Sequence, residues 1–288
     1  MADDDEQEYS TSVGAVHVDG DGRIYLIVVM SDGENFYSRL TRLNDIAIQA
    51  AGEPIGEQYG GNFWLTDMTR TPDGHFFLAD GNGNVHTEVD GAWTIEPVSP
   101  GRGLRCLWIS AEGQVYAAGT LGVVYQRKSD GWEAISPPLD NWISAIGGPT
   151  HSNLLAVGNN GLVWRFDGSA WRQVELAANA NFTGILWQAP DVFTICGGSG
   201  ALFRGSGDEW ADLSTGGGDL FKLTAYTTDI WVAAGTAGVG RLTEAGLTIV
   251  RSTFAGYRIH SAGRYLAAAG NNIVARFNGE NWHGRSYQ

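Results

Sequence analysis

The chain has 288 residues, with 18 Lys and Arg against 32 Asp and Glu, so its formal net charge is −14. Such a charge repels phosphate backbones and anionic lipid headgroups, which argues against nucleic acid or a membrane surface as a partner. The 41 glycines and 11 tryptophans, with only 17% charged residues, are typical of short strands joined by tight turns. The composition therefore favours an all-β fold over a helical or disordered chain.

Five acidic residues lie among the first eight, from Met1 to Glu8. This segment lacks the apolar core of a signal peptide or a membrane anchor. No run of about 18 apolar residues follows it anywhere in the chain. We therefore expect a flexible acidic N-terminus over residues 1–10, a single domain over residues 11–288, and a cytoplasmic location.

The first part of that domain divides into four predicted strands by alternation and turn residues. They are Ser12–Val18, Arg23–Met30, Asn35–Arg42 and Asp45–Ala50. The segment Asp19-Gly20-Asp21-Gly22 resembles a fragment of a calcium-binding loop, but it lacks the twelve-residue pattern with a terminal Glu, so we predict a hairpin turn.

A glycine-rich loop then repeats along the rest of the chain. Five copies read Ala117-Ala118-Gly119-Thr120-Leu121-Gly122, Ala156-Val157-Gly158-Asn159-Asn160-Gly161, Ile195-Cys196-Gly197-Gly198-Ser199-Gly200, Ala233-Ala234-Gly235-Thr236-Ala237-Gly238 and Ala268-Ala269-Gly270-Asn271-Asn272-Ile273, and Ala79 to Val85 is a looser sixth copy. The repeated glycines lie at positions 81, 119, 158, 197, 235 and 270, which are 38, 39, 39, 38 and 35 residues apart. This period is that of a β-propeller blade.

A tryptophan follows most of these loops in a small polar turn. Trp93, Trp132, Trp171 and Trp210 are each 39 residues apart, Trp282 occupies the last copy, and the sixth blade has Ala245-Gly246-Leu247 instead. We interpret the tryptophans as packing residues that fill the widening gap between blades. The small residues before each repeated glycine allow neighbouring sheets to approach closely.

Each period divides into four strands, as the third blade shows with Leu104–Ser110, Gln114–Gly119, Val123–Lys128 and Trp132–Ser136. In the turn before Trp132, Gly131 supplies the positive φ that a tight hairpin requires. The fold prediction is a seven-bladed β-propeller with four antiparallel strands per blade, over residues 11–57, 58–99, 100–138, 139–178, 179–217, 218–255 and 256–288. Six blades with an appended sheet is the alternative, because the first blade lacks both the glycine loop and the tryptophan.

The last blade has its own outer strand from Trp282 to Tyr287, so ring closure needs no strand exchange between the termini. We expect closure by packing of the first blade against the seventh. Cys106 and Cys196 lie in apolar stretches without a CxxC partner, and we predict that both are buried free thiols.

The repeat, Val-Tyr-Ala-Ala-Gly-Thr-x-Gly-x-Val-Tyr followed by Asp-Gly-x-Trp, resembles bacterial propeller repeats related to the photosystem II assembly factor and to the Asp-box (BNR) proteins. The resemblance covers about residues 59–288 and implies the propeller fold. It implies little about function, because such repeats serve as assembly factors, lectins and sialidases. The Asp-box itself is only partly kept, in the compressed form Ser129-Asp130-Gly131-Trp132.

Catalytic chemistry has little support in the sequence. The six histidines, His17, His75, His86, His151, His260 and His283, show no metal-binding spacing and fall in different blades. The glycine loops lack the Lys-Ser/Thr and the strand-to-helix context of a phosphate-binding loop. We therefore expect no catalytic residues, no metal and no cofactor.

Function in propellers usually lies on the face where the loops between blades gather with the loops that join second and third strands. A large residue recurs near the start of the innermost strand, at Trp64, Leu104, Trp142, Phe182, Phe221 and Tyr257. Polar residues lie beside this row, among them Asn62, Arg105, Asp140, Asn141, Asn181, Lys222 and Arg258. Aromatic and Arg residues over a polar rim are typical of protein-binding hot spots, and aromatic residues with Asn and Asp are typical of sugar sites.

The first functional hypothesis is a non-catalytic module that binds a cationic protein through this face, such as an assembly factor or an immunity protein that neutralises a basic toxin. The second is a lectin with several repeated glycan sites. The third is a hydrolase or lyase with its site at the propeller axis.

Overall fold

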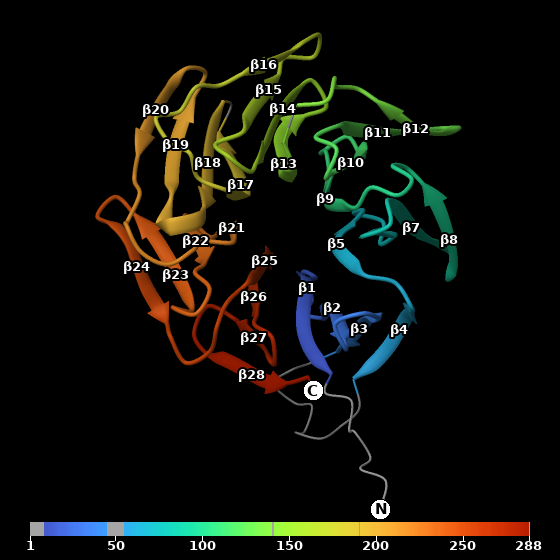
Figure 1. Ribbon diagram of the computed structural model, residues 1–288. Coiled ribbons are helices and arrows are strands. Elements are labelled where there is room, and N and C mark those ends of the chain that lie inside the picture. The colour runs from blue at the N-terminus through green and yellow to red at the C-terminus, as the bar shows by residue number, and fades with distance from the viewer. Residues whose placement is uncertain (1–8, 45–54, 140, 190, 288) are drawn as a thin grey trace, which may run out of the picture.

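The structure is a computed structural model that describes residues 9–44, 55–139, 141–189 and 191–287. Seven four-stranded antiparallel sheets are arranged as a ring around a central axis (Figure 1). Each sheet consists of four consecutive strands, and the first strand of each lies innermost. The seven-bladed prediction is confirmed, and the six-bladed alternative is wrong.

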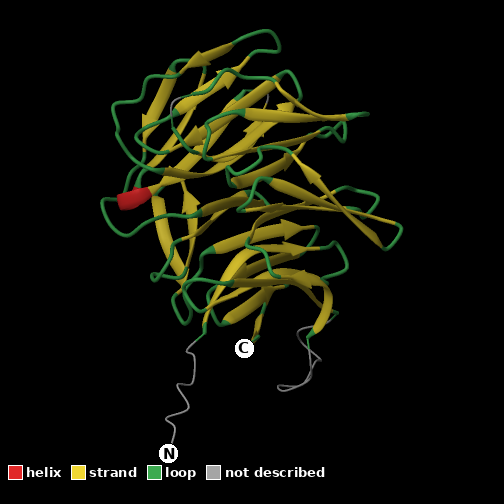
Figure 2. Ribbon diagram, turned by 45° about the vertical axis from the view of Figure 1, so that its right-hand side comes forward, coloured by secondary structure: helices red, strands yellow, loops and turns green. Residues whose placement is uncertain are grey.

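The strands of the first four blades are β1 (Ser10–Val18), β2 (Ile24–Ser31), β3 (Phe36–Leu43), β4 (Gly56–Gly61), β5 (Leu65–Arg70), β6 (Phe76–Asp80), β7 (Asn84–Val89), β8 (Ala92–Pro97), β9 (Leu104–Ile109), β10 (Val115–Gly119), β11 (Val124–Lys128), β12 (Gly131–Ala134), β13 (Ile143–Thr150), β14 (Asn153–Gly158), β15 (Val163–Phe166) and β16 (Trp171–Gln173). Those of the last three blades are β17 (Phe182–Ala189), β18 (Val192–Gly197), β19 (Leu202–Ser206), β20 (Glu209–Asp212), β21 (Lys222–Tyr226), β22 (Asp229–Ala233), β23 (Val239–Thr243), β24 (Gly246–Arg251), β25 (Arg258–Ala262), β26 (Tyr265–Ala269), β27 (Ile273–Phe277) and β28 (Trp282–Ser286). A short 3₁₀ turn, η1 (Gly198–Gly200), is the only helical element in the described parts of the chain (Figure 2). No helix there is long and apolar enough to cross a membrane.

The outer strand of the first blade differs from the sequence expectation. It is β4, Gly56–Gly61, which pairs with β3, and the second blade begins at Leu65. The predicted strand Asp45–Ala50 lies outside the described residues, as does most of the acidic segment expected over residues 1–10. β4 reads Gly-Glu-Gln-Tyr-Gly-Gly and is largely exposed, so it carries no apolar alternation that could have marked it.

The small residues of the repeat lie between the blades, as predicted. Ala117 and Ala118 are both fully buried, and because successive strand residues face opposite sides, Ala117 packs toward the second blade and Ala118 toward the fourth. Trp132 packs in the gap toward the preceding blade, where its indole N–H donates to Glu96 Oε2 at 2.9 Å. The tryptophans therefore seal the outer gaps between blades.

The repeated glycine has a steric cause. A β-carbon on Gly119 would lie 2.1 Å from the carbonyl oxygen of Gly103, where the chain enters the innermost strand of the same blade. Gly131 has φ +136°, which confirms the predicted positive φ in the hairpin turn. Both glycines are therefore required by backbone geometry.

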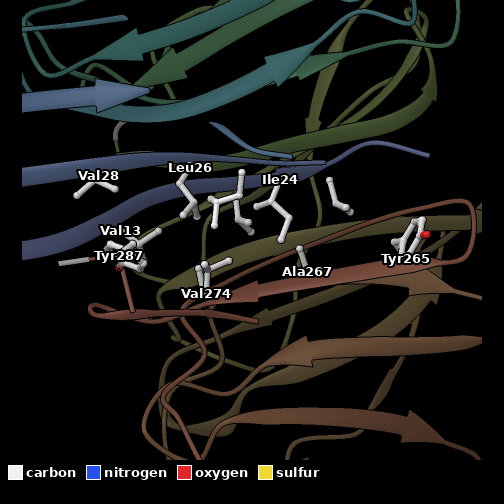
Figure 3. Close-up of a cluster of buried hydrophobic side chains, with 12 residues drawn as sticks. Val13, Ile24, Leu26, Val28, Tyr265, Ala267, Val274 and Tyr287 are labelled. Carbon is white, nitrogen blue, oxygen red and sulfur yellow. The ribbon is translucent and has the colours of Figure 1, made fainter. Parts of the chain in front are cut away.

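The ring closes by side-chain packing between the first and the seventh blade, as expected. Apolar residues of both blades form one buried cluster, which includes Leu26, Val28, Ala267, Val274 and Tyr287 (Figure 3). All four strands of each of these sheets come from one continuous segment, so no strand is exchanged between the termini. Polar contacts reinforce this seam, since Arg276 Nη1 donates to the Gly22 carbonyl at 2.7 Å.

Candidate partner-binding site

The propeller has two faces, which follow from the alternating direction of its strands. The loop face carries the loops that join second to third strands and the loops between blades. The turn face carries the turns that join first to second and third to fourth strands. The sequence-predicted site lies on the loop face.

The residues at the entry to each innermost strand are placed by backbone hydrogen bonds to the glycine loops. The Trp64 carbonyl accepts from Gly81 N at 2.8 Å, and the Trp142 carbonyl accepts from Asn159 N at 3.1 Å. The equivalent acceptors in the third and fifth blades are Gly103 and Asn181. In these four blades the structurally equivalent positions are therefore 64, 103, 142 and 181.

This register corrects two members of the predicted aromatic row. Leu104 and Phe182 lie one residue further along than Trp64 and Trp142, and a shift of one residue turns a side chain to the opposite side of a strand. Both are buried, and Phe182 packs edge to face against Phe203 at 5.9 Å. The structure therefore removes Phe182 from the proposed partner-binding surface.

Two tryptophans of the row are prominent on the loop face. Trp64 is 43% exposed and Trp142 is 44% exposed, which is unusual for side chains of this size. Trp64 stacks on Phe36 at 5.1 Å, and Trp142 stacks against the Arg105 guanidinium at 4.3 Å. Both rings are thus held in place while one side remains accessible.

Leu121 is a further exposed apolar residue of the loop face, 39% exposed, that sequence reasoning did not select. It occupies the variable position of the glycine loop in the third blade, between Thr120 and Gly122. The other four copies have Asn160, Ser199, Ala237 and Asn272 in this position, so a large apolar side chain at 121 departs from the repeat. This departure from the repeat could have identified Leu121 as a candidate contact residue from the sequence.

A cavity of about 420 Å³ lies at the loop-face end of the axis. It brings together five predicted site residues, which are Trp64, Arg105, Phe221, Tyr257 and Arg258. Phe221 and Tyr257 meet edge to face at 5.0 Å. Among the described residues that line the cavity there is no histidine and no carboxylate, so this lining supplies no acid–base pair.

The cations of the axis sit in a partly apolar environment. Arg258 Nη1 donates to its neighbour's carbonyl, that of Tyr257, at 3.0 Å, and Nε donates to the Gly14 carbonyl across the closure seam. Burial lowers the pKa of both Arg105 and Arg258.

Burial also raises the pKa of the Cys106 and Cys196 thiols to about 12, and the nearby charge of Lys222 partly offsets this rise. Both cysteines are buried and free, as predicted.

The predicted polar residues have mixed positions. Asn62 lines a separate pocket of about 380 Å³ beside Trp64. Asn141 and Asn181 serve the scaffold, because their side-chain oxygens accept hydrogen bonds from the side chain and backbone of Asn160, each at 3.0 Å. Asp140 lies outside the described residues.

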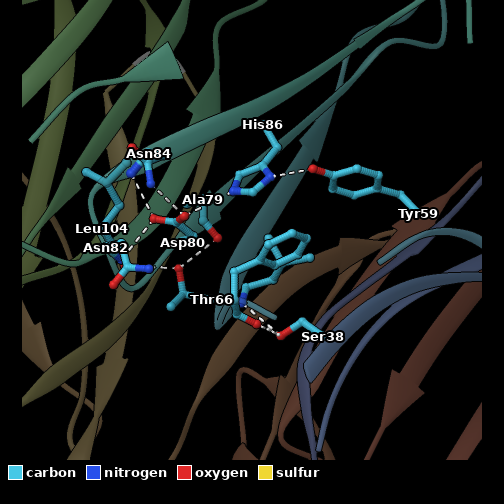
Figure 4. A network of polar contacts seen from close by, with 11 residues as sticks. Ser38, Tyr59, Thr66, Ala79, Asp80, Asn82, Asn84, His86 and Leu104 are labelled. Carbon is cyan, nitrogen blue, oxygen red and sulfur yellow. Dashed lines mark hydrogen bonds and ion pairs between the residues drawn. The ribbon is translucent and has the colours of Figure 1, made fainter. Parts of the chain in front are cut away.

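A buried polar network supports the glycine loop of the second blade on this face (Figure 4). Asp80 accepts hydrogen bonds from Asn82 N, from Asn84 N and Nδ2, and from His86 Nε2, and the other ring nitrogen of His86 contacts the Tyr59 hydroxyl at 2.8 Å. Burial alone would raise the pKa of Asp80, but the hydrogen bonds from His86 and Asn84 outweigh it and keep that pKa below its usual range. Burial and the charge of Asp80 raise the pKa of Tyr59. The network fixes the loop next to Trp64.

The turn face is acidic instead. In each of blades two to seven, an exposed acidic residue stands in or beside the turn between the third and fourth strands, and these residues are Asp90, Asp130, Asp167, Asp208, Glu244 and Glu280. No group of three or more His, Cys, Asp or Glu side chains in the described segments is arranged to hold a metal ion.

The comparisons with known proteins add one informative relative. Immune protein Tsi7 of Pseudomonas aeruginosa is 31% identical over 170 residues. This chain is similar to a bacterial immune protein. The match covers 54% of the chain and 54% of Tsi7, so the chain spans about half the length of the curated relative it matches.

The other comparisons concern the fold. A chain in the crystal structure of a mitotic checkpoint complex superposes with a TM-score of 0.69 over 95% of this chain and 89% of that chain, at 13% identity. That likeness shows the propeller fold alone. No protein-family model matches the chain, so the likeness to the photosystem II assembly factor and Asp-box repeats remains a resemblance.

Proposed function

We propose that this chain is an immunity protein that acts in the cytoplasm by binding and neutralising a protein toxin. The observation that carries the proposal is the 31% identity to Immune protein Tsi7. The propeller supports it because this scaffold offers a broad, rigid loop surface that binds without large rearrangement.

The contact surface in this proposal is the part of the loop face around Trp64, Leu121 and Trp142. Exposed tryptophans that are fixed by stacking lose little side-chain entropy on binding, and Trp is enriched among residues that dominate binding energy. Arg105, held against Trp142, adds a charged group beside the apolar contact. The surface therefore combines the features of a protein-binding hot spot.

The partner in this proposal is cationic. A net charge of −14 creates a negative potential around the molecule that accelerates the approach of a basic protein. This attraction acts over about a Debye length, whereas the tryptophans act only in contact. Charge therefore sets the association rate, and the loop face sets the lifetime of the complex.

The test is affinity capture from lysate of the native host on the immobilised protein, with elution by a salt step and mass spectrometry. We expect one stoichiometric basic protein. That protein should arrest growth of a test bacterium when it is produced alone, and co-production of this chain should restore growth. A captured protein that is harmless, or whose toxicity this chain does not relieve, would refute the immunity function.

A matched pair of variants locates the interaction. Trp64→Ala with Trp142→Ala removes the exposed rings of the loop face, and Asp90→Asn with Asp130→Asn changes the turn face by two charges. Capture should be lost with the first pair and kept with the second. The reverse result would move the partner to the turn face.

A further inference from the structure

The axial cavity extends beyond the exposed tryptophans and Arg105 of the proposed protein contact. Its volume of about 420 Å³ is that of a small-molecule site, and it lies between the first three and the last two blades. Aromatic side chains, Trp64, Phe221 and Tyr257, form one part of its lining. Arg105 and Arg258 form another.

Arg105 has unused hydrogen-bonding capacity. Its side chain makes no hydrogen bond or ion pair with any described residue, and its Nε is buried without a partner. Its guanidinium lies over the Trp142 ring at 4.3 Å. Stacking occupies the flat side of a guanidinium and leaves its N–H groups free at the edge, where they bind planar oxyanions.

The other cations of the axis also lack carboxylate partners among the described residues. Among the residues that the structure describes, Arg258 donates to the carbonyls of Gly14 and Tyr257 alone, and Lys222 forms no ion pair. One carboxylate, that of Asp67, lies close enough to influence Arg258, and its Oδ2 accepts a hydrogen bond from Leu107 N at 3.0 Å. In a chain with 32 acidic and 18 basic side chains, the described residues place Arg105, Lys222 and Arg258 near one carboxylate, that of Asp67.

Desolvated cations that outnumber the nearby carboxylates are costly, and an anion that reaches them relieves that cost. The lining hydroxyl groups of Thr66 and Thr120 donate to backbone carbonyls, so the N–H groups of the arginines are the donors offered to an anion. Thr66 Oγ1 donates to the Leu104 carbonyl at 2.9 Å, so its position is fixed. The aromatic side chains make one side of the cavity apolar and favour a ligand with an apolar part.

We propose that the axial cavity binds a small organic oxyanion, a carboxylate or phosphate attached to a planar apolar group, with the oxyanion at Arg105 and Arg258 and the apolar group against Trp64, Phe221 and Tyr257. Anion binding at this site does not depend on the proposed protein contact. The two share Trp64 and Arg105 at the rim of the cavity, so an anion in the cavity would change the surface that a protein partner meets.

The test is isothermal titration calorimetry of the full chain with four probes, namely benzoate, phenyl phosphate, inorganic phosphate and benzyl alcohol. We expect benzoate or phenyl phosphate to bind with Kd of about 1 mM or tighter. Inorganic phosphate, which lacks the ring, should bind more weakly, and benzyl alcohol, which lacks the charge, should show no binding. The stronger of the first two identifies the natural oxyanion as carboxylate or phosphate.

Two variants complete the test. Arg105→Gln keeps a polar side chain of similar length. It should weaken the affinity for the anion at least ~10-fold, because a charge-assisted hydrogen bond is lost. Arg23→Gln, at an exposed ion pair with Asp21 on the turn face, is the matched control and should leave binding unchanged. Circular dichroism confirms that both variants are folded.

Absence of binding by every anion at about 10 mM would overturn the proposal, since it corresponds to an interaction weaker than about 3 kcal/mol. Equal binding of benzyl alcohol would also overturn it, because the site would then be merely apolar. Anion binding that Arg105→Gln leaves intact would place the ligand elsewhere. None of these outcomes bears on capture of a toxin, which is measured separately.

Discussion

The two faces of this propeller differ in how their side chains are used. On the loop face, Trp64, Trp142 and Arg105 are held by stacking or by a buried network beneath them. On the turn face, the acidic residues stand singly in hairpin turns and are exposed, as Asp130 is. A surface whose side chains are fixed in advance is suited to tight contact, whereas scattered exposed charges act mainly at a distance. We therefore assign contact to the loop face and steering to the whole acidic molecule.

The largest difference between the faces should appear in stability. Asp80→Ala removes the acceptor of four hydrogen bonds from a buried network and should lower the free energy of unfolding by about 3 to 5 kcal/mol. Asp130→Ala, on the turn face, should change it by less than about 0.5 kcal/mol. Chemical denaturation monitored by fluorescence measures both. Similar losses for the two variants would show that the loop face is no better supported than the turns.

The next largest effect should be on partner affinity. Trp142→Ala should weaken the complex by about 2 kcal/mol, or roughly 30-fold, mainly through faster dissociation. The matched control is Ile95→Ala, another exposed apolar residue, which lies on an outer strand away from the loop face. Surface plasmon resonance with the captured partner gives both rate constants. An unchanged dissociation rate for Trp142→Ala would exclude this ring from the interface.

A smaller effect should separate the faces by pH. His260 stacks on His17 at 4.2 Å near the turn-face end of the closure seam, and burial together with the charge of His17 lowers the pKa of His260 to about 3. Below pH 6.5, the ordinary pKa of histidine, His260 is protonated in the unfolded chain but stays neutral in the folded chain. The free energy of unfolding therefore has its full value above this pH and decreases as the pH falls below it. The slope should approach 1.4 kcal/mol per pH unit for this one proton.

The pH effect has a clear control. His260→Gln keeps a side-chain oxygen that can accept the hydrogen bond now donated by Val18 N, and it should flatten the slope between pH 6.5 and 5. Asp80 cannot contribute in this range, because its pKa lies below the usual 3.8. Denaturation at several pH values decides the matter, and a slope that persists in His260→Gln would point to other groups.

The smallest effect concerns the turn face itself. Asp90→Asn with Asp130→Asn should slow partner association by less than about 3-fold, and this slowing should vanish at high salt. Dissociation should be unaffected. A faster dissociation in the variant would mean that the turn face touches the partner and that the contrast between the faces is wrong.

Much of the fold could be predicted from the sequence because the repeat is a backbone requirement. Gly119, Gly158, Gly197 and Gly270 recur since any side chain there would meet a backbone oxygen. The tryptophans recur since each blade leaves the same outer gap. β4 escaped prediction because it is polar and exposed, so no burial pattern marks it. The first blade also lacks the glycine loop and the tryptophan, so the repeat could not be used to locate β4.

The site was harder to predict for two physical reasons. A shift of one residue decides whether a side chain points into a blade, and it separated buried Phe182 from exposed Trp142. Convergence on the axis joins residues more than a hundred positions apart, as Arg105 and Arg258 are, and no spacing in the sequence reports it. Leu121 is the one contact that comparison between repeats could have revealed.

The most direct test of the central claim is amide hydrogen exchange of the chain alone and in complex with its captured partner. Contact through the loop face predicts slower exchange at residues 62–66, 120–122 and 141–143 in the complex, with the turns at residues 90–91, 130–131 and 167–170 unchanged. Protection confined to those turns would contradict the account, and would make the acidic face, rather than the exposed tryptophans, the surface that binds.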